Sequence, residues 1–198
     1  MNKAVFIDKD GTLIEDVPYN VRPELIRLLP GVGDGLRLLQ ADGYQLIIVS
    51  NQAGAAYGFF AETDLVVVVR RIQQLVARLG ARLDDFYFCP HHPEGTVPTL
   101  ATVCTCRKPS PGLIKRAAKQ HQLDLTKCWM IGDILNDVEA GRRAGCRTVM
   151  VDNGNETEWH YGSLRQPDYQ VNNFWQAAQL ITGKADPLMK PQRTSHAV

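Results

Sequence analysis

The chain has 198 residues, of which 44% are hydrophobic and 22% charged, and its formal net charge is +1. This length predicts a single domain with one sizeable core, and the near-neutral charge argues against a nucleic-acid partner. The sequence contains neither an apolar run long enough to span a membrane nor the layout of a signal peptide. We therefore expect a cytoplasmic protein without a membrane partner. The odd number of cysteines, five, argues against a disulfide framework.

Short apolar runs predict strands, and longer runs with a 3.6-residue period predict helices. In chain order, the expected strands are 4–7, 45–50, 86–88, 128–133, 147–151 and 169–171. The helices expected between and after them are 31–42, 63–79, 111–120, 137–144 and 173–181. We expect Thr63 and Ser110 to be N-caps and Pro111 to take the first helical position. Gly43 and Gly145 should stop the helices that precede them.

The alternation of strands and helices predicts an α/β protein with a doubly wound, mainly parallel sheet. We expect one domain over residues 1–182 and a disordered polar tail over 183–198. Two long irregular segments, 15–30 and 90–112, interrupt the pattern. Irregular segments of this length inside a compact domain are usually functional. The first should therefore face a substrate, and the second needs something that holds it in place.

Three of the expected strands end in polar residues, namely Asp8 and Asp10, Ser50, and Asp133. The carboxyl ends of parallel strands meet at one edge of a sheet, where ligands bind, and Lys108 lies in a loop before a helix. Carboxylates hold Mg²⁺, a hydroxyl and an ammonium hold phosphate oxygens, and an aspartate can form an aspartyl-phosphate. One such strand end alone is an ordinary acidic turn, but the combination favours phosphoryl transfer.

The second irregular segment contains four soft metal donors, which are Cys89, His91, Cys104 and Cys106. Four Cys and His ligands make a closed tetrahedral zinc site, and zinc binding would hold the loop 89–106 in place. Since no ligand position stays open, we expect the zinc to be structural. His92 is the rival ligand, and the alternative interpretation is that these residues lie near one another by accident.

Four motifs occur in order along the chain: Asp8-x-Asp10-Gly-Thr12, Ser50-Asn51, Lys108-Pro109 and Gly132-Asp133-x-x-Asn136-Asp137. They resemble the motifs of the haloacid-dehalogenase-like (HAD) phosphatases, and the match spans nearly the whole chain to Val151. The cysteine and histidine loop is similar to that of the histidinol-phosphatase and heptose-bisphosphate phosphatase group. The resemblance implies a Rossmann-like fold without a cap domain, a catalytic Mg²⁺ and a zinc-binding loop.

The resemblance also implies catalytic roles. Asp8 would be the nucleophile, and Asp10 would be the general acid and base. Asp8, Asp133 and the backbone carbonyl of Asp10 would be the protein ligands of Mg²⁺. Lys9, between the two aspartates, should point away from the site, and we assign it no chemistry.

The resemblance further implies residues that bind the phosphate, residues that contact the rest of the substrate, and residues that support the site. The phosphate-binding residues would be Ser50, Asn51 and Lys108. The residues that contact the substrate would be Asp16, Tyr19, Gln52, Ala53 and Arg107. Asn136 and Asp137 would support the site from behind, by orienting Lys108 or a metal-bound water.

The function implied by the resemblance is Mg²⁺-dependent removal of phosphate from a small phosphosugar by a monomer, foremost the 7-phosphate of a heptose 1,7-bisphosphate. Histidinol phosphate and other small phosphosugars are the alternative substrates. In one loop the chain reads Ala56-Tyr57-Gly58, whereas the heptose enzymes usually have Ala-Arg-Gly. A non-catalytic binding module built around the zinc loop is a more distant alternative, because Asp8, Asp10, Lys108 and Asp133 are all present.

Overall fold

The computed structural model describes residues 2–160 and 162–185. A six-stranded parallel sheet with strand order β3-β2-β1-β4-β5-β6 forms its centre. The strands are β1 (Ala4–Ile7), β2 (Gln45–Asn51), β3 (Asp85–Cys89), β4 (Trp129–Gly132), β5 (Arg147–Val151) and β6 (Tyr169–Val171). The helices are α1 (Val32–Ala41), α2 (Leu65–Arg78), α3 (Gly112–His121), α4 (Leu135–Ala144) and α5 (Phe174–Ile181), with short 3₁₀ turns η1 (Pro23–Leu25), η2 (Glu62–Asp64) and η3 (Leu125–Lys127). The expected doubly wound parallel fold is confirmed.

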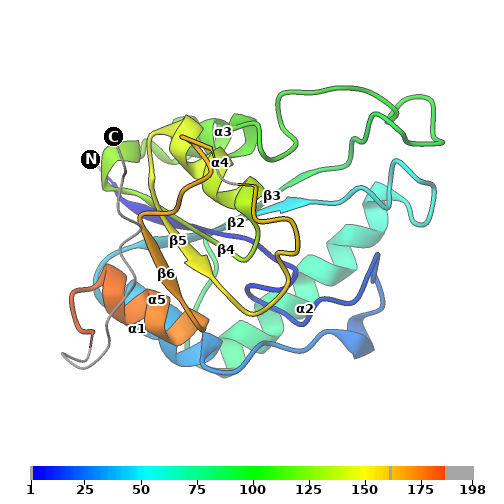
Figure 1. Ribbon diagram of the computed structural model, residues 1–198. Coiled ribbons are helices and arrows are strands. Elements are labelled where there is room, and N and C mark those ends of the chain that lie inside the picture. The colour runs from blue at the N-terminus through cyan, green and yellow to red at the C-terminus, as the bar shows by residue number, and fades with distance from the viewer. Residues whose placement is uncertain (1, 161, 186–198) are drawn as a thin grey trace.

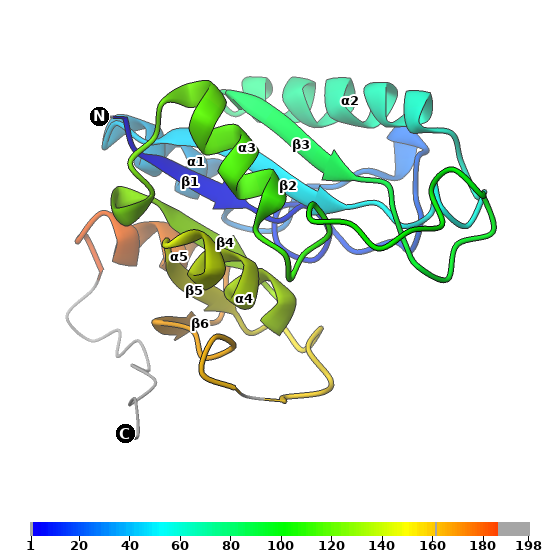
Figure 2. The same ribbon diagram turned by 90° about the horizontal axis from the view of Figure 1, so that it is seen from above.

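Helices cover both faces of the sheet, with α1, α2 and α5 on one face and α3 and α4 on the other (Figures 1 and 2). Successive side chains of a strand point to opposite faces. In β1, Val5 and Ile7 therefore join the core under α1, α2 and α5, whereas Ala4 and Phe6 join the core under α3 and α4. Because both faces are covered, all four side chains of β1 are fully buried.

The strand register decides which residues meet at the edge of the sheet. Ile7 of β1 aligns with Ile48 of β2 on one side and with Ile131 of β4 on the other. Because these three strands are parallel, the residues that follow them emerge at the same edge of the sheet. The strand ends that carry Asp8 and Asp133 are therefore neighbours in space, as the sequence predicts.

Each of the five helices starts one or two residues away from its predicted position, and the starts of α2, α3 and α4 show why. Thr63 lies inside η2 rather than capping α2, and the Asp64 carboxylate accepts a hydrogen bond from the backbone N–H of Ala61 at 2.9 Å. Helix α3 begins at Gly112, so Pro111 is the residue before the helix, and Ser110 instead closes a turn onto the carbonyl of Arg107. Helix α4 begins at Leu135, two positions before the expected start.

The predicted helix stops are confirmed, since Gly43 and Gly145 have φ angles of 82° and 92° that favour glycine. Between β1 and β2 the described chain adds only η1 and α1, as expected for an enzyme without a cap domain. None of the helices in the described residues has the length and apolar character needed to cross a membrane. Most of the predicted tail, 186–198, lies outside the described residues.

Candidate active site

Strand β1 delivers the first aspartate to the edge of the sheet. The backbone N–H of Asp8 continues the ladder by donating to the carbonyl of Ile131 in β4 at 2.9 Å. The turn that follows requires glycine at Gly11, which has φ 76°, and a Cβ there would lie 2.1 Å from a carboxylate oxygen of Asp133. The turn therefore brings the β1 end against the β4 end, and the side chain of Asp8 stays only 11% exposed.

Lys108 comes from a loop a hundred residues further along the chain and contacts Asp8 directly. Its ammonium also forms an ion pair with Asp137 at 2.6 Å and donates to the carbonyl of Val49 at 2.9 Å. The side-chain amide of Asn51 makes two hydrogen bonds with the backbone of Lys108, at 3.0 and 2.9 Å. These bonds tie the lysine loop to β2, so the ammonium is fixed beside the carboxylate.

Asp133 completes this group at the end of β4. One of its carboxylate oxygens accepts from the hydroxyl of Thr12 at 2.9 Å, and the other accepts from the amide of Asn155 at 2.6 Å. Oxygen atoms of Asp8, Asp133 and Asp137 all lie within 4.8 Å of one another. Gly132 makes room for this approach, because a Cβ there would lie 2.2 Å from the Cβ of Asp137.

The electrostatics of the group show an excess of negative charge. Burial raises the pKa of Asp8 well above its usual value, and Lys108 only partly opposes that shift. Burial, and then Asp137, raises the pKa of Asp133 to about 6. Burial alone would lower the pKa of Lys108, but Asp137 and Asp8 outweigh it and raise that pKa. Three carboxylates share one ammonium, so the group suits an additional cation.

Asp10 lies beside this group and is held from two directions. The amide of Gln52 donates to Asp10 at 3.1 Å and to the hydroxyl oxygen of Ser50 at 2.8 Å. The ammonium of Lys9 lies 2.5 Å from the other carboxylate oxygen of Asp10, and the Lys9 side chain is only 2% exposed. The prediction that Lys9 points away is therefore wrong: its long side chain folds back, so that the buried ammonium is paired.

The remaining predicted residues do not all meet at this point. Asn136 does not orient Lys108, because its side-chain oxygen accepts from Arg165 at 3.1 Å. Arg107 donates to the carbonyl of His91 at 3.5 Å. Burial raises the pKa of Asp16, the charge of Asp10 raises it further, and Lys9 opposes the shift.

Two other predicted contact residues belong to the loops around the site. Tyr19 packs against other aromatic rings, and the carbonyl of Ala53 accepts from the backbone N–H of Tyr57 at 3.0 Å.

The segment after β5 contributes residues that the sequence analysis did not single out. Asn155 holds Asp133, and the amide of Asn153 donates to the carbonyl of Gly11 at 2.5 Å. The carboxylate of Glu156 accepts from the backbone N–H of Leu135 at 2.7 Å, at the first turn of α4. The available signal was the polar run 152–156 directly after an apolar strand, which is the same pattern that marks the other strand ends.

The four predicted zinc ligands converge in a second cluster, which we call the sulfur cluster (Cys89, His91, Cys104 and Cys106). Their donor atoms all lie within 4.8 Å of one another, and the sulfur of Cys89 lies 2.9 Å from that of Cys106 and 3.5 Å from that of Cys104. Ligand sulfurs of tetrahedral zinc lie about 3.7 Å apart, so the cluster is slightly tighter than a loaded site. The rival His92 turns away and pairs with the hydroxyl of Tyr57 at 3.0 Å.

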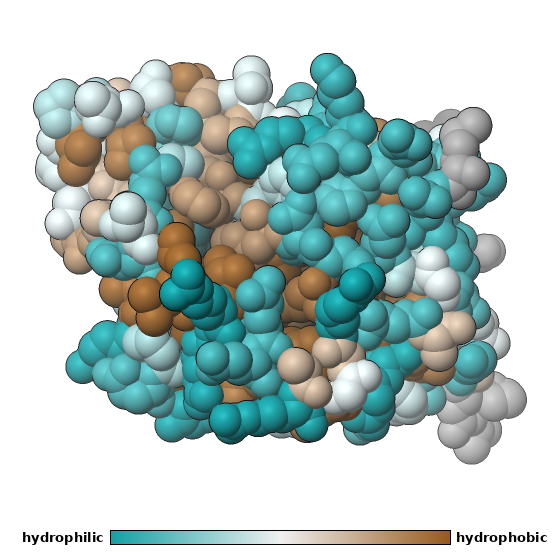
Figure 3. All heavy atoms as spheres, turned by 180° about the vertical axis from the view of Figure 1, so that it is seen from behind, coloured by the Kyte–Doolittle hydropathy of each residue, from teal (hydrophilic) through white to brown (hydrophobic). Residues whose placement is uncertain are grey.

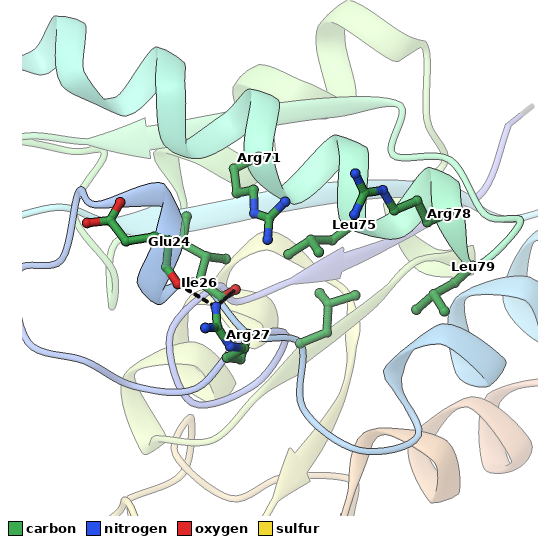
Figure 4. A pocket seen from close by; sticks show the side chains of 8 residues that line it. Glu24, Ile26, Arg27, Arg71, Leu75, Arg78 and Leu79 are labelled. Carbon is green, nitrogen blue, oxygen red and sulfur yellow. Dashed lines mark hydrogen bonds between the residues drawn. The ribbon is translucent and has the colours of Figure 1, made fainter.

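Two cavities lie away from the carboxylates and the sulfur cluster. One, of about 460 Å³, is lined by Arg27, Arg71, Arg78 and neighbouring side chains between the segment after η1 and the end of α2 (Figure 4). The other, of about 570 Å³, lies between α2 and the edge strand β3, on the face where apolar side chains gather in Figure 3. Asp8, Asp10, Asp133 and Asp137 line neither cavity.

Comparisons with known proteins agree with this site. The family model HAD-hydrolase-like matches residues 105–177. D-glycero-beta-D-manno-heptose-1,7-bisphosphate 7-phosphatase of Rhodopseudomonas palustris is 41% identical over 72% of this chain and 79% of its own length. The corresponding alpha-anomer phosphatase of Photorhabdus laumondii is 35% identical over 78% of this chain and 85% of its own length.

A solved structure of a similar fold contains magnesium and phosphate. The D,D-heptose 1,7-bisphosphate phosphatase of B. bronchiseptica, complexed with magnesium and phosphate, superposes with a TM-score of 0.73 and 26% identity, over 93% of this chain and the whole of that one. Fold, strand-end residues and relatives agree, and this chain therefore belongs to the D-glycero-D-manno-heptose-1,7-bisphosphate 7-phosphatase family of HAD-like phosphoric monoester hydrolases.

Proposed function

We propose that this protein removes the 7-phosphate of D-glycero-D-manno-heptose 1,7-bisphosphate through an aspartyl-phosphate intermediate. The observation that carries this proposal is the buried Asp8 carboxylate, fixed between the Lys108 ammonium and Asp133. A nucleophile, a phosphate-binding cation and a metal-binding carboxylate are the three parts that phosphoryl transfer requires. The names of the relatives support heptose bisphosphate as the substrate.

The proposed reaction has two steps. A carboxylate oxygen of Asp8 attacks phosphorus, the bond from phosphorus to the sugar oxygen breaks, and Asp10 gives its proton to that oxygen. A water molecule then attacks phosphorus and gives a proton to Asp10, and the bond to Asp8 breaks to release inorganic phosphate. Ser50 and Lys108 hold the phosphoryl oxygens while negative charge builds on them. The Gln52 amide bridges Asp10 and Ser50, which keeps the proton donor next to the phosphate.

Asp8, Asp133 and the backbone carbonyl of Asp10 would hold Mg²⁺ in this scheme. The excess of buried carboxylates over ammonium groups fits a hard divalent cation with oxygen ligands. When bound, Mg²⁺ would neutralise charge on the transferring phosphoryl group. Asp137 is already paired with Lys108, so we assign it to positioning that lysine rather than to the metal.

The sulfur cluster would hold a structural Zn²⁺. Three sulfurs and one imidazole nitrogen are a complete tetrahedral ligand set, so no position stays open for a substrate. The loop residues Asp16, Tyr19, Ala53 and Arg107 would contact the sugar, and Asn51 would add to phosphate binding while it holds Lys108. Cytoplasmic location and a monomeric state stay predictions from the sequence.

A screen of phosphate release with Mg²⁺ tests the proposed substrate. The panel contains both anomers of the heptose bisphosphate, histidinol phosphate and common sugar phosphates. We expect kcat/KM for a heptose bisphosphate anomer to exceed that for every other substrate by at least about tenfold, or about 1.4 kcal/mol. The relatives are named for either anomer, so both must be included. A clear preference for histidinol phosphate would overturn the substrate assignment and leave the phosphatase mechanism in place.

A further inference from the structure

Three aromatic side chains, two of them exposed and one half-buried, form a cluster on the loops around the active site. We call Tyr19, Tyr57 and Phe59 the aromatic platform. Ring centroids lie 4.8 Å apart for Tyr19 and Phe59, 5.7 Å for Tyr57 and Phe59, and 6.1 Å for Tyr19 and Tyr57. Tyr19 is 51% exposed and Phe59 is 61% exposed, so the contiguous ring surface faces solvent.

The platform is not a displaced piece of the core. Phe60, the neighbour of Phe59, is 9% exposed and packs with Ala55 and Leu65 in a small apolar cluster. Phe60 therefore anchors the loop, while Phe59 points the other way. The sequence offers two adjacent phenylalanines, and the fold buries only one of them. Contiguous exposed apolar rings next to polar loops mark binding surfaces rather than packing.

Tyr19 also carries backbone strain. Its φ angle is 54°, in the left-handed region that a residue with a Cβ seldom adopts. Such strain persists only where the surrounding structure imposes it, and it concentrates at sites that bind or react. Here a tight turn imposes it, because the backbone N–H of Asn20 donates to the carbonyl of Val17 at 3.1 Å, and this turn presents the Tyr19 ring to Tyr57 and Phe59.

Short chain connections link the platform to residues that contact or respond to Asp10. Gln52 hydrogen-bonds to Asp10, and the tight turn that follows returns the backbone N–H of Tyr57 to the carbonyl of Ala53 at 3.0 Å. Tyr19 lies three residues after Asp16, whose carboxyl responds to the charge of Asp10. In Figure 2 the loops that follow β1, β2 and β3 gather at the same end of the sheet.

The platform is also fixed in place by the neighbouring loop. The hydroxyl of Tyr57 contacts a ring nitrogen of His92 at 3.0 Å, and the hydroxyl of Thr96 donates to the carbonyl of Tyr57 at 3.0 Å. The segment that contains the sulfur cluster thus supports the rings from the side. A ligand that binds them would not have to order them first.

We propose that the aromatic platform binds the apolar C–H face of the sugar ring that carries the phosphate, and so selects ring-form sugar phosphates over acyclic phosphate esters. This inference rests on the proposed function, because the phosphate must occupy the Asp8 and Lys108 end of the same site. A sugar ring has one face rich in C–H groups, and these carry the partial positive charge that the negative face of an aromatic ring attracts.

The test uses the double variant Tyr19→Ala/Phe59→Ala with Val103→Ala as the matched control, since Val103 is a hydrophobic residue of the zinc loop that is 83% exposed. We expect the double variant to raise KM for heptose bisphosphate by about tenfold, with kcat nearly unchanged. Inorganic phosphate, a ring-free probe of the phosphate site, should inhibit both variants and the parent protein with the same inhibition constant.

Three outcomes would overturn the inference. The first is an unchanged KM of the double variant for heptose bisphosphate. The second is a loss of affinity for inorganic phosphate as large as the rise in KM, which would mean a disturbed phosphate site, and the third is a change in the molar mass of the protein in solution, which would mean that the platform is a protein interface. A wrong substrate assignment can be distinguished from a wrong role for the platform. If the parent protein prefers another ring-form sugar phosphate, the double variant should still raise KM for that compound and leave phosphate inhibition unchanged.

Discussion

The protein contains two clusters of residues with the composition of metal sites, and the two are built differently. The carboxylate cluster (Asp8, Asp133 and Asp137 around Lys108) lies at the ends of buried parallel strands, and its own ammonium neutralises part of its charge. The sulfur cluster has one member on a strand, Cys89, and three in a segment without helix or strand.

Because of this difference, a bound metal should have different consequences for folding and for catalysis in the two clusters. The sheet positions the carboxylates by its own hydrogen bonds and packing, so Mg²⁺ there should contribute chemistry and little folding energy. The segment 90–111 contains neither helix nor strand and is held by loop hydrogen bonds, such as those of Asn51 to the backbone of Lys108, rather than by a sheet ladder, so Zn²⁺ there should contribute folding energy and no chemistry. Four measurements test whether the two clusters differ in this way.

Asp8→Asn should show the largest effect, on activity alone. An amide cannot form the aspartyl-phosphate, so we expect kcat/KM to fall by at least about 10³-fold, or about 4 kcal/mol. The melting temperature should change little, because the amide is close in shape and removes a charge that burial disfavours. Phosphate release and thermal unfolding are measured on the same sample. Residual activity within tenfold of the parent protein would rule out Asp8 as the nucleophile.

Asp137→Asn should lower both activity and stability, because it leaves the buried Lys108 with one carboxylate partner fewer. Breaking a buried ion pair typically costs about 3–5 kcal/mol. Asn136→Ala is the matched control, since Asn136 is the next residue in the chain but contacts Arg165. Denaturant unfolding and phosphate release should separate the two variants clearly. If both variants lost the same activity and stability, the substitutions would disturb helix α4 and not the ion pair.

Cys104→Ser should act on stability and metal content first. Loss of one ligand should lower the melting temperature by roughly 5–10 °C and reduce bound zinc, because binding energy is folding energy for this segment. Cys146→Ala provides the control, since Cys146 is buried near β5 and lies outside the cluster. Metal analysis and calorimetry measure both quantities. Removal of Mg²⁺ should leave the melting temperature nearly unchanged, and a large drop there would contradict the contrast between the clusters.

The pH dependence of stability should have opposite signs in the two clusters. The raised pKa of Asp133, about 6, means that the folded state takes up a proton at a higher pH than the unfolded state, whose value is near 3.8. Without Mg²⁺, this group should therefore add stability as the pH falls from about 7 to 5, by roughly 2–5 °C in melting temperature. Zinc binding needs deprotonated sulfurs, so the zinc contribution should fall over the same range.

Asp133→Asn separates the two effects, because it removes this titration and leaves the sulfur cluster intact. Melting temperatures of the parent protein and the variant are compared across the pH range without Mg²⁺. If the variant and the parent protein show the same pH slope, Asp133 is not the group that titrates.

Much of the framework could be predicted from local sequence. The strand Ala4–Ile7 is predicted with its exact bounds because an apolar run directly precedes two aspartates, and only a buried strand accommodates that run. The helix stops at Gly43 and Gly145 follow from the need for a positive φ. The start of α2 was missed because the 3₁₀ turn η2 precedes it, and local propensity does not separate the two kinds of helical turn.

The direction of individual side chains depended on residues far away in the chain. Lys9 sits between two aspartates, and strand alternation predicts that it points away. Its buried ammonium nevertheless pairs with Asp10. Neighbouring Asn136 and Asp137 look equivalent in sequence, yet only Asp137 contacts Lys108, because a helix turns successive side chains by about 100°. Asn155 contacts Asp133 only after β4 and β5 pair.

The sequence by itself determined which chemical groups this protein possesses, namely the aspartates, the lysine, and the cysteines with their histidine, because residue type and spacing are local properties. The parallel register decided that Asp8 and Asp133 meet, and the tertiary structure decided that Lys108 joins them and that Tyr19, Tyr57 and Phe59 form one exposed surface. The physical reason is that contacts between residues far apart in the chain depend on the packing of the whole sheet and its loops, which no single segment specifies.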